Sequence, residues 1–581
     1  MNWTAGAAFL FFHALLTPSL MVPIDNVSTE PYQNTEFYHP RNKIRITTDC
    51  GEVTGRVSTS TNTERKMYEF LNIPYATPPV RNLRFEAPLV YNKNNTWVRE
   101  VDATQERTIQ CVQTTWSRDT DGAGTEDCLY LTLRSGDVTA SKPVLVWIHG
   151  GGLFGGHCCQ PGYSFDAEIT EVLDAVTVNI NYRLGFLGFH SIEELWNRET
   201  GVYANNGIRD MVAALQWIQN NVAKFGGDPD RITLVGHSGG GTAVLALIAS
   251  PLAVNLFHRA VVLAPAPEFR WDYKVGNVFQ RNVTEVLEVT GCSGSPNKKK
   301  CLQQVDAKWL TSYVNGRVNP SGRLKDYVNF VGAGWLDFPL RYGKNADYIG
   351  LIMRDPVVIP NAPKDLASSK HLHKINDKVK LIIGNTAHET VFYPYMWNFA
   401  SWHDITTVTN LIKNLSTSLL NKTEEEISHV LQSYQDLTPQ AVWDTFTSDM
   451  RATCPLNNLA EKLADSPKHE VYRMFTTFGL WFGKGYRTYH GWETEALFGF
   501  KTHILSPSSK GWDFRDVLVN MIKEFAHNGT VDSRWGLYPS HSLTLGGAFI
   551  KTIKKFTEGS PNHEKCEKLK AANLDRYGWQ N

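Results

Sequence analysis

The stretch RITLVGHSGGGTAVLALIAS, residues 231–250, decides the fold that we predict for this chain. Residues 232–235 are apolar and mostly β-branched, which is typical of a buried strand, and residues 242–248 suit a helix. The glycines on both sides of Ser238 let the backbone turn sharply, so this serine is expected at the tip of a strand-to-helix elbow. A nucleophile belongs there. A glycine-rich loop also contains a serine by chance, so the other segments decide between these two interpretations.

The segments around this elbow predict an α/β fold with a mostly parallel sheet covered by helices. Residues 142–148 and the start of 175–189 have buried-strand patterns, and residues 207–225 have apolar side chains at the three- and four-residue spacings of an amphipathic helix. Buried strands that alternate with helices indicate a parallel sheet. Farther upstream, residues 44–57 predict a hairpin and residues 70–88 an irregular surface stretch.

Consecutive glycines follow the strand at 142–148, in the sequence HGGG of residues 149–152. Acyl transfer needs amide N–H groups that point at a developing oxyanion, and glycines present them without interference from a Cβ. We predict an oxyanion hole from the amides of Gly151, Gly152 and Gly239. The same glycines formally match a dinucleotide fingerprint, but that fingerprint must open a helix, and a Pro-Gly pair interrupts the sequence here.

An acid and a base follow two further strand patterns. Glu389 lies just past the strand-like residues 380–383, and His490 lies in a loop beyond residues 472–475. A carboxylate past a strand end can hold the tautomer and orientation of a histidine. Either residue alone is usually surface or structural; together with Ser238 they form a candidate triad.

Composition excludes several classes of function. The chain has 581 residues without an internal repeat or a Pro/Ser-rich linker, so one large domain, 21–581, with an insertion at about 265–375, is predicted. Its 58 basic and 58 acidic residues remove any general attraction to nucleic acid or anionic membranes. The oligomeric state is not readable from the sequence.

The first residues predict the compartment. Residues 5–16 are apolar but too few to span a bilayer, so residues 1–20 are interpreted as a secretory signal peptide, and no later segment is long enough for a membrane span. We expect a secreted protein, or one in the lumen of the secretory pathway. Six sequons are expected to carry glycans, at Asn26, Asn94, Asn282, Asn414, Asn421 and Asn528.

Nine cysteines suit an oxidising compartment, where most should be paired. Proximity in sequence suggests Cys111 with Cys128 and Cys292 with Cys301, and the odd total leaves at least one thiol free or paired between chains. The adjacent Cys158 and Cys159, after His157, suggest metal ligands at first. Neighbouring cysteines rarely reach one metal with good geometry, so a disulfide or packing role is favoured and no metal is predicted.

In these segments and others, the chain resembles the type-B carboxylesterase/cholinesterase family of α/β-hydrolases along nearly all of its mature length. The resemblance is carried by motifs in family order, including TEDCLYL from 125, VWIHGGG from 146, NYRLG from 181, GHSGG from 236, HGWETEALFG from 490 and FAHNG from 525. It implies Ser238 as nucleophile, Glu389 as acid and His490 as base. It also implies three disulfides and two ion pairs, namely Cys111–Cys128, Cys292–Cys301, Cys454–Cys566, Arg84 with Glu126 and Arg183 with Asp210.

The chain departs from the family pattern at three places beside the candidate triad. Gly239 stands where the family usually has alanine, Thr390 where glycine is common, and His237 where cholinesterases have glutamate. Cys50, Cys158 and Cys159 fall outside the family's disulfides.

The resemblance implies a cofactor-free serine esterase acting on small carboxylic esters through an acyl-enzyme. The alternatives are a choline ester hydrolase, with Trp116, Phe392 and Tyr393 as its candidate aromatic residues, an acyltransferase using the same acyl-enzyme, and a non-catalytic adhesion protein.

Overall fold

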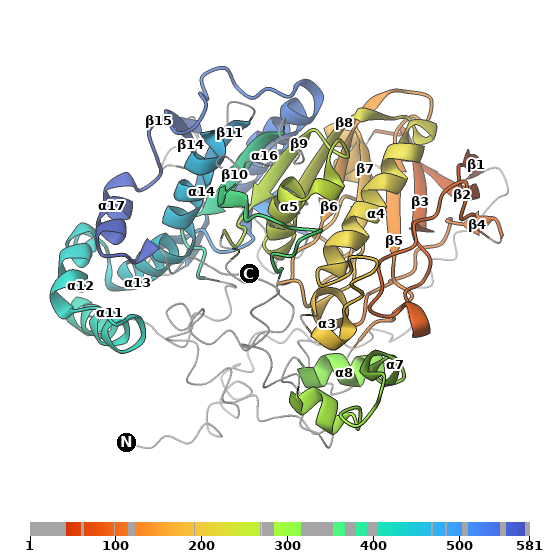
Figure 1. Ribbon diagram of the computed structural model, residues 1–581. Helices are drawn as coiled ribbons and strands as arrows, with labels where there is room; N and C mark the ends of the chain where they lie inside the picture. Colours follow the sequence, from red (N-terminus) through yellow and green to blue (C-terminus); the bar gives the residue numbers. More distant parts are fainter. Residues whose placement is uncertain are drawn as a thin grey trace, which may run out of the picture.

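A mixed β-sheet organises the computed structural model (Figure 1). The structure describes residues 42–575 apart from 60–62, 98, 114–122, 191, 268, 270–283, 315–351, 366–378, 392–403, 466–468, 483–484, 502–508 and 547–553. Within these residues the sheet has 13 strands in the order β1-β2-β3-β5-β7-β6-β8-β9-β10-β11-β14-β15, and β4 pairs with β2.

The centre of the sheet is parallel. Each neighbouring pair from β7 to β14 runs in the same direction. The carboxyl ends of these strands therefore share one edge, where the loops after β6, β8, β10 and β11 meet. The strands are β7 (Val176–Ile180), β6 (Lys142–Ile148), β8 (Gly227–His237), β9 (Arg259–Leu263), β10 (Lys380–Thr386), β11 (Glu470–Thr476) and β14 (His541–Leu545).

Antiparallel strands flank this centre on both sides. The predicted hairpin is confirmed as β1 and β2, but the irregular stretch predicted at 70–88 is wrong at its start, because Phe70 and Ile73 lie fully buried in β3. Burial on both faces removes the polar alternation that would have marked this strand. The flanking strands are β1 (Lys43–Thr48), β2 (Gly51–Thr59), β3 (Lys66–Pro74), β5 (Tyr130–Ser135) and β15 (Lys554–Glu558), with the short β4 (Val101–Asp102) beside β2.

Helices cover both faces of the sheet, and the strand sequence decides which side chains meet them. Along β6, Val144 and Val146 join one apolar cluster, whereas Leu145 and Trp147 join another, as the two-residue period of a strand requires. The first cluster packs against α4 (Asn206–Asn221), α5 (Gly239–Ala249) and α14 (Cys454–Ala464). The second packs against α2 (Ala167–Leu173), α15 (Trp492–Leu497) and α16 (Ser509–Asn528).

The remaining helices form two groups beside the sheet (Figure 1). One contains α11 (Ile405–Leu420), α12 (Glu424–Leu431), α13 (Pro439–Ser448) and α17 (His563–Ala571), which share an apolar cluster. The other contains α3 (Gly185–Phe189), α7 (Lys298–Leu302) and α8 (Ala307–Val314). The helices α7 and α8 belong to the predicted insertion at 265–375, much of which lies outside the described residues. Separately, β12 (Leu480–Phe482) and β13 (Gly485–Arg487) form a small antiparallel hairpin.

Several predictions about processing and glycosylation fall on residues that the structure does not describe. These include the signal peptide at 1–20 and the sequons at Asn26 and Asn282. In the described part of the chain, no helix combines the length and apolar character needed to cross a membrane. The four described sequon residues, Asn94, Asn414, Asn421 and Asn528, are all exposed.

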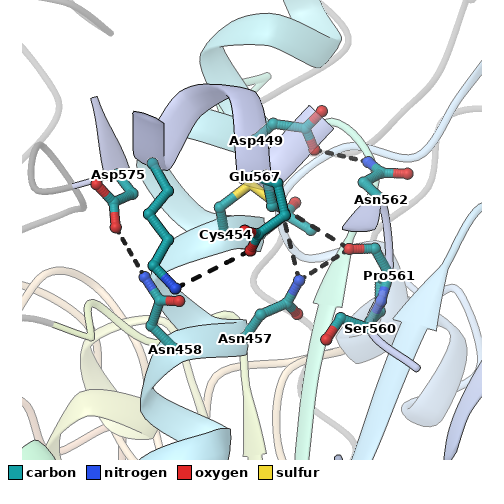
Figure 2. The surroundings of a disulfide bond; sticks show 12 residues. Asp449, Cys454, Asn457, Asn458, Ser560, Pro561, Asn562, Glu567 and Asp575 are labelled. Carbon is teal, nitrogen blue, oxygen red and sulfur yellow. Dashed lines mark hydrogen bonds and ion pairs between the residues drawn. A yellow bond between two sulfur atoms is a disulfide. The ribbon is translucent and has the colours of Figure 1, made fainter. Parts of the chain in front are cut away.

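The structure joins the six cysteines that the family resemblance pairs. The S–S distances are 2.07 Å for Cys111–Cys128, 2.01 Å for Cys292–Cys301 and 1.99 Å for Cys454–Cys566. Figure 2 shows how the last of these fastens α17 to α14.

Asn457 and Asn458 of α14 extend this attachment. Asn457 donates to the Pro561 carbonyl at 2.8 Å, and Asn458 donates to Asp575 at 3.0 Å (Figure 2). The Asn457 amide oxygen also accepts from Arg473 of β11 at 3.0 Å. The C-terminal helix is therefore linked through α14 to β11, a strand of the parallel centre of the sheet.

Candidate active site

The predicted elbow lies between β8 and α5. Ser238 has φ 56° and ψ −125°, a strained conformation for a residue with a side chain, of the kind that clusters at functional sites. The turn brings the backbone of the two flanking glycines so close to other backbone atoms that neither position has room for a Cβ. A Cβ on Gly240 would lie only 2.1 Å from the Ile148 carbonyl oxygen, and one on Gly236 would lie 2.5 Å from the Gly240 oxygen. The Ser238 amide donates to the Leu263 carbonyl of β9 at 2.9 Å, which fixes the tip against the sheet.

The predicted acid and base are in direct contact. Nδ1 of His490 lies 2.6 Å from Oε2 of Glu389, and the Thr386 amide donates to Oε1 of Glu389 at 2.5 Å. Glu389 is fully buried, and the His490 side chain is 9% exposed. With a carboxylate acceptor at Nδ1, that nitrogen carries the proton and Nε2 is left as the acceptor.

Backbone pairing between the two loops aligns these side chains. His388 and Tyr489 form a parallel bridge, the His388 amide donates to Thr488 at 3.1 Å, and the His490 amide donates to Val391 at 2.8 Å. Burial lowers the pKa of His388 to about 3, and its neutral ring accepts from the Thr488 amide at 3.1 Å. The acid loop and the histidine loop are thus joined over several residues.

Thr390, one of the departures from the family pattern, anchors the acid loop from the other side. Its hydroxyl contacts the hydroxyls of Thr447 at 2.7 Å and Ser448 at 3.0 Å, and its amide donates to Ser448 at 3.2 Å. Since both partners belong to α13, the threonine ties the loop to that helix where glycine has no side chain to do so.

The His490 ring packs beside the elbow. Its centroid lies 4.7 Å from that of His237, the residue before Ser238, with the rings inclined by 40°. His237 is 6% exposed, and burial together with the neighbouring His490 holds the pKa of His237 well below its usual range. The residue that replaces the cholinesterase glutamate is therefore a neutral imidazole.

The glycine loop after β6 approaches the same elbow. A Cβ on Gly150 would lie 3.2 Å from the Ser238 Cβ, and one on Gly239 would lie 3.0 Å from the Gly152 nitrogen. Gly151 and Gly152 have φ 110° and 62°, which favour glycine. The glycine loop at Gly150 and Gly152 thus lies against Ser238 and Gly239, and the Gly239 amide belongs to the first turn of α5, where amides have no partner within the helix.

The base of the glycine loop is held by Tyr182. Its ring stacks on His149 with the centroids 4.4 Å apart, and its hydroxyl donates to the His149 carbonyl at 2.7 Å. The two ion pairs that the family resemblance implies are also present: Arg84 contacts Glu126 and Arg183 contacts Asp210, each at 2.6 Å.

Glu493 is a site residue that the sequence analysis missed. It is fully buried in the first turn of α15, and burial together with the negative charge of Glu389 raises the pKa of Glu493 to about 8. The sequence signal was an acidic residue three places after His490, in a short helix whose residues are all buried. At neutral pH Glu493 is therefore mostly protonated and brings no negative charge of its own to the site.

Some predicted residues cannot be placed. Trp116, Phe392 and Tyr393, the candidate aromatic residues for a choline ester, lie outside the described residues. Across the described ranges, no group of three or more His, Cys, Asp and Glu side chains is arranged to hold a metal ion.

Comparison with known proteins shows the family and the fold. Residues 42–565 match the model of the carboxylesterase family. The chain is 26% identical to an acetylcholinesterase of Leptinotarsa decemlineata over 89% of this chain and 84% of that protein. It is 30% identical to carboxylesterase 1E of Rattus norvegicus over 68% of each. A solved PNB esterase superposes with a TM-score of 0.67 at 22% identity, covering 90% of this chain and 99% of the other, which confirms the predicted α/β-hydrolase fold.

Proposed function

Because the chain belongs to the carboxylesterase family and is a carboxylic ester hydrolase, we propose that Ser238, His490 and Glu389 form its catalytic triad. The single observation that carries this proposal is the 2.6 Å contact between Glu389 and His490, beside the strained serine. The three residues come from three different strand ends, and an arrangement that brings them to one edge of the sheet suits nucleophilic catalysis.

Acylation begins with proton transfer. Nε2 of His490 takes the proton of the Ser238 hydroxyl, and Oγ attacks the ester carbonyl carbon, while the Glu389 carboxylate stabilises the imidazolium through Nδ1. The negative charge that develops on the carbonyl oxygen is held by the amides of Gly151, Gly152 and Gly239. The tetrahedral intermediate then collapses, and the alcohol leaves with the proton from His490.

Deacylation repeats these steps with water in place of the serine. His490 takes a proton from water, the resulting hydroxyl attacks the acyl-enzyme, and the carboxylic acid leaves as the proton returns to Ser238. Every step of this proposed mechanism uses only side chains and backbone amides of the chain itself.

The preferred substrate in this proposal is an ester with a neutral alcohol. A quaternary ammonium is attracted by negative charge and by aromatic faces. In this chain, neutral His237 stands beside the nucleophile where cholinesterases have glutamate, so that source of negative charge is absent at this position. A comparison of acetylthiocholine with a neutral short-chain thioester tests this choice, and faster turnover of acetylthiocholine contradicts it.

Secretion is also part of the proposal. Three disulfides within the described residues and four exposed sequon asparagines support passage through an oxidising, glycosylating compartment. Expression in animal cells with recovery from the medium tests this, together with the mobility shift after enzymatic removal of N-glycans.

The nucleophile is tested by Ser238→Ala and by fluorophosphonate labelling. Ser238→Ala should abolish turnover of a p-nitrophenyl ester and remove the label, and mapping of the wild-type protein should find the label on Ser238. Ser418→Ala, at an exposed position of α11, is the matched control and should keep both activity and label. Turnover by Ser238→Ala at the wild-type rate would overturn the assignment.

A further inference from the structure

Two adjacent thiols lie directly after the glycine loop, outside the family's disulfides. The Sγ atoms of Cys158 and Cys159 are 2.7 Å apart. That distance exceeds the ~2.05 Å of a disulfide bond by about 0.65 Å, so a small movement of the sulfurs would bring them to bonding distance. Cys158 is 1% exposed, whereas Cys159 is half-buried. Of the two residues Cys159 is therefore the nearer to solvent, and Cys158 lies behind it.

The polar groups around the pair hold both sulfurs in place. The Cys158 amide donates to Asn181 Oδ1 at 2.7 Å, and Cys159 Sγ lies 3.4 Å from the Thr132 hydroxyl. That hydroxyl oxygen already accepts from the Asn72 amide at 3.2 Å, so its own hydrogen is free to stabilise a sulfur anion.

The two thiols differ in acidity. The contact with Cys158, and then the positive charge of Arg134, lower the pKa of the Cys159 thiol, whereas burial raises the pKa of the Cys158 thiol. The thiolate is the nucleophile in disulfide exchange. The less buried residue of the pair is thus also the one whose thiol ionises first.

We propose that Cys158 and Cys159 form a redox modification site, which small aliphatic disulfides such as oxidised glutathione convert to a vicinal disulfide. The Cys159 thiolate attacks one sulfur of the reagent, whose S–S bond breaks and releases one thiol. Cys158 then loses its proton to solvent and attacks Cys159 Sγ, which forms the protein disulfide and releases the second thiol. Two protein thiols are oxidised, and one small disulfide is reduced to two thiols.

The bond should be easy to reverse. Consecutive Cα atoms are about 3.8 Å apart across a trans peptide, less than the ~4.4–6.8 Å of ordinary disulfides, and such a deviation makes the bond more reducible. The ring closed by a Cys158–Cys159 disulfide would begin two residues beyond Gly156, whose amide and carbonyl both bond to the Gln113 side chain, at 2.8 and 3.0 Å.

This inference does not depend on the proposed triad, because its test measures thiols.

The test uses the folded full chain, exposed to oxidised glutathione and then to an alkylating agent. In the wild type, the peptide that contains both cysteines should lose two hydrogen atoms and take up no alkyl group. The bond should open at about a tenfold lower reductant concentration than the three other disulfides. Stable glutathione on Cys159 of the wild type, or two alkyl groups on the peptide after oxidation, would overturn the proposal.

Variants separate the roles of the two sulfurs. Cys158→Ser should trap glutathione on Cys159, and Cys158→Ala should do the same if serine disturbs the buried position. Cys159→Ser should react at least tenfold more slowly than the wild type. Cys50→Ala is the matched control, since Cys50 is a buried single thiol elsewhere in the chain, and it should leave vicinal oxidation unchanged.

Discussion

Gly239→Ala should impair catalysis, although alanine is the residue that this family usually carries at the position. A Cβ on Gly239 would lie 2.9 Å from the Leu153 nitrogen and 3.0 Å from the Gly152 nitrogen. Both are backbone atoms, so no flexible side chain can move away to make room. Because ordinary contact begins at 3.4 Å, the glycine loop must retreat by about 0.5 Å (3.4 − 2.9).

The size of the effect follows from the proposed role of that loop. Loss of one oxyanion donor typically costs ~10²–10³ in rate, and a donor that is displaced rather than deleted costs part of that. We expect kcat to fall by about 10- to 100-fold, equivalent to ~1.4–2.7 kcal/mol of transition-state stabilisation. KM should change little, because the developing oxyanion, rather than the bound ester, loses its partner.

The assay is steady-state turnover of a p-nitrophenyl ester, with thermal unfolding measured on the same samples. Gly136→Ala is the matched control, since a Cβ at this exposed position meets nothing within 4 Å, and its kcat should equal that of the wild type. A Gly239→Ala variant with kcat within twofold of the wild type would refute the reasoning. Either the loop yields without cost or it does not hold the oxyanion.

Three further predictions follow from the buried titratable groups. Glu389→Gln should lower kcat by about 10⁴-fold without unfolding the protein, because the amide no longer holds the imidazole in its reactive form; a loss below tenfold in the p-nitrophenyl ester assay would argue against its role. Glu493 has a folded pKa of about 8 against an ordinary value of 4.5, so the folded chain holds a proton that the unfolded chain releases, and stability falls as the pH rises between these values. Glu493→Gln removes this cost and should be more stable than the wild type by up to about 3 kcal/mol at pH 7 but not at pH 4.5, as urea unfolding at both pH values would measure. Buried His190 has a pKa of about 3 against 6.5, so the unfolded chain binds the extra proton, and stability falls as the pH drops through this window. Between pH 7 and pH 5 the wild type should lose about 2 kcal/mol more than His190→Leu in the same measurement, and equal losses would contradict the assignment.

Local sequence determined the central strands and the elbow. The predicted strand at 142–148 and the elbow at Ser238 appear where expected, because apolar runs and glycines act through neighbouring residues. The same local signals failed at β3, where burial on both faces of the sheet hides the strand pattern.

The contacts of the candidate site were decided only by tertiary structure. Glu389 and His490 are 101 residues apart in sequence, and only the parallel pairing of β10 with β11 places them 2.6 Å from each other. The acidic residue at 493 is visible in the sequence, but the burial of its carboxyl and the ring contact between His237 and His490 arise only from tertiary packing. Sequence specified which groups can react. Strand order and burial specified which of them meet and in which protonation state, because distance and desolvation are properties of the folded chain.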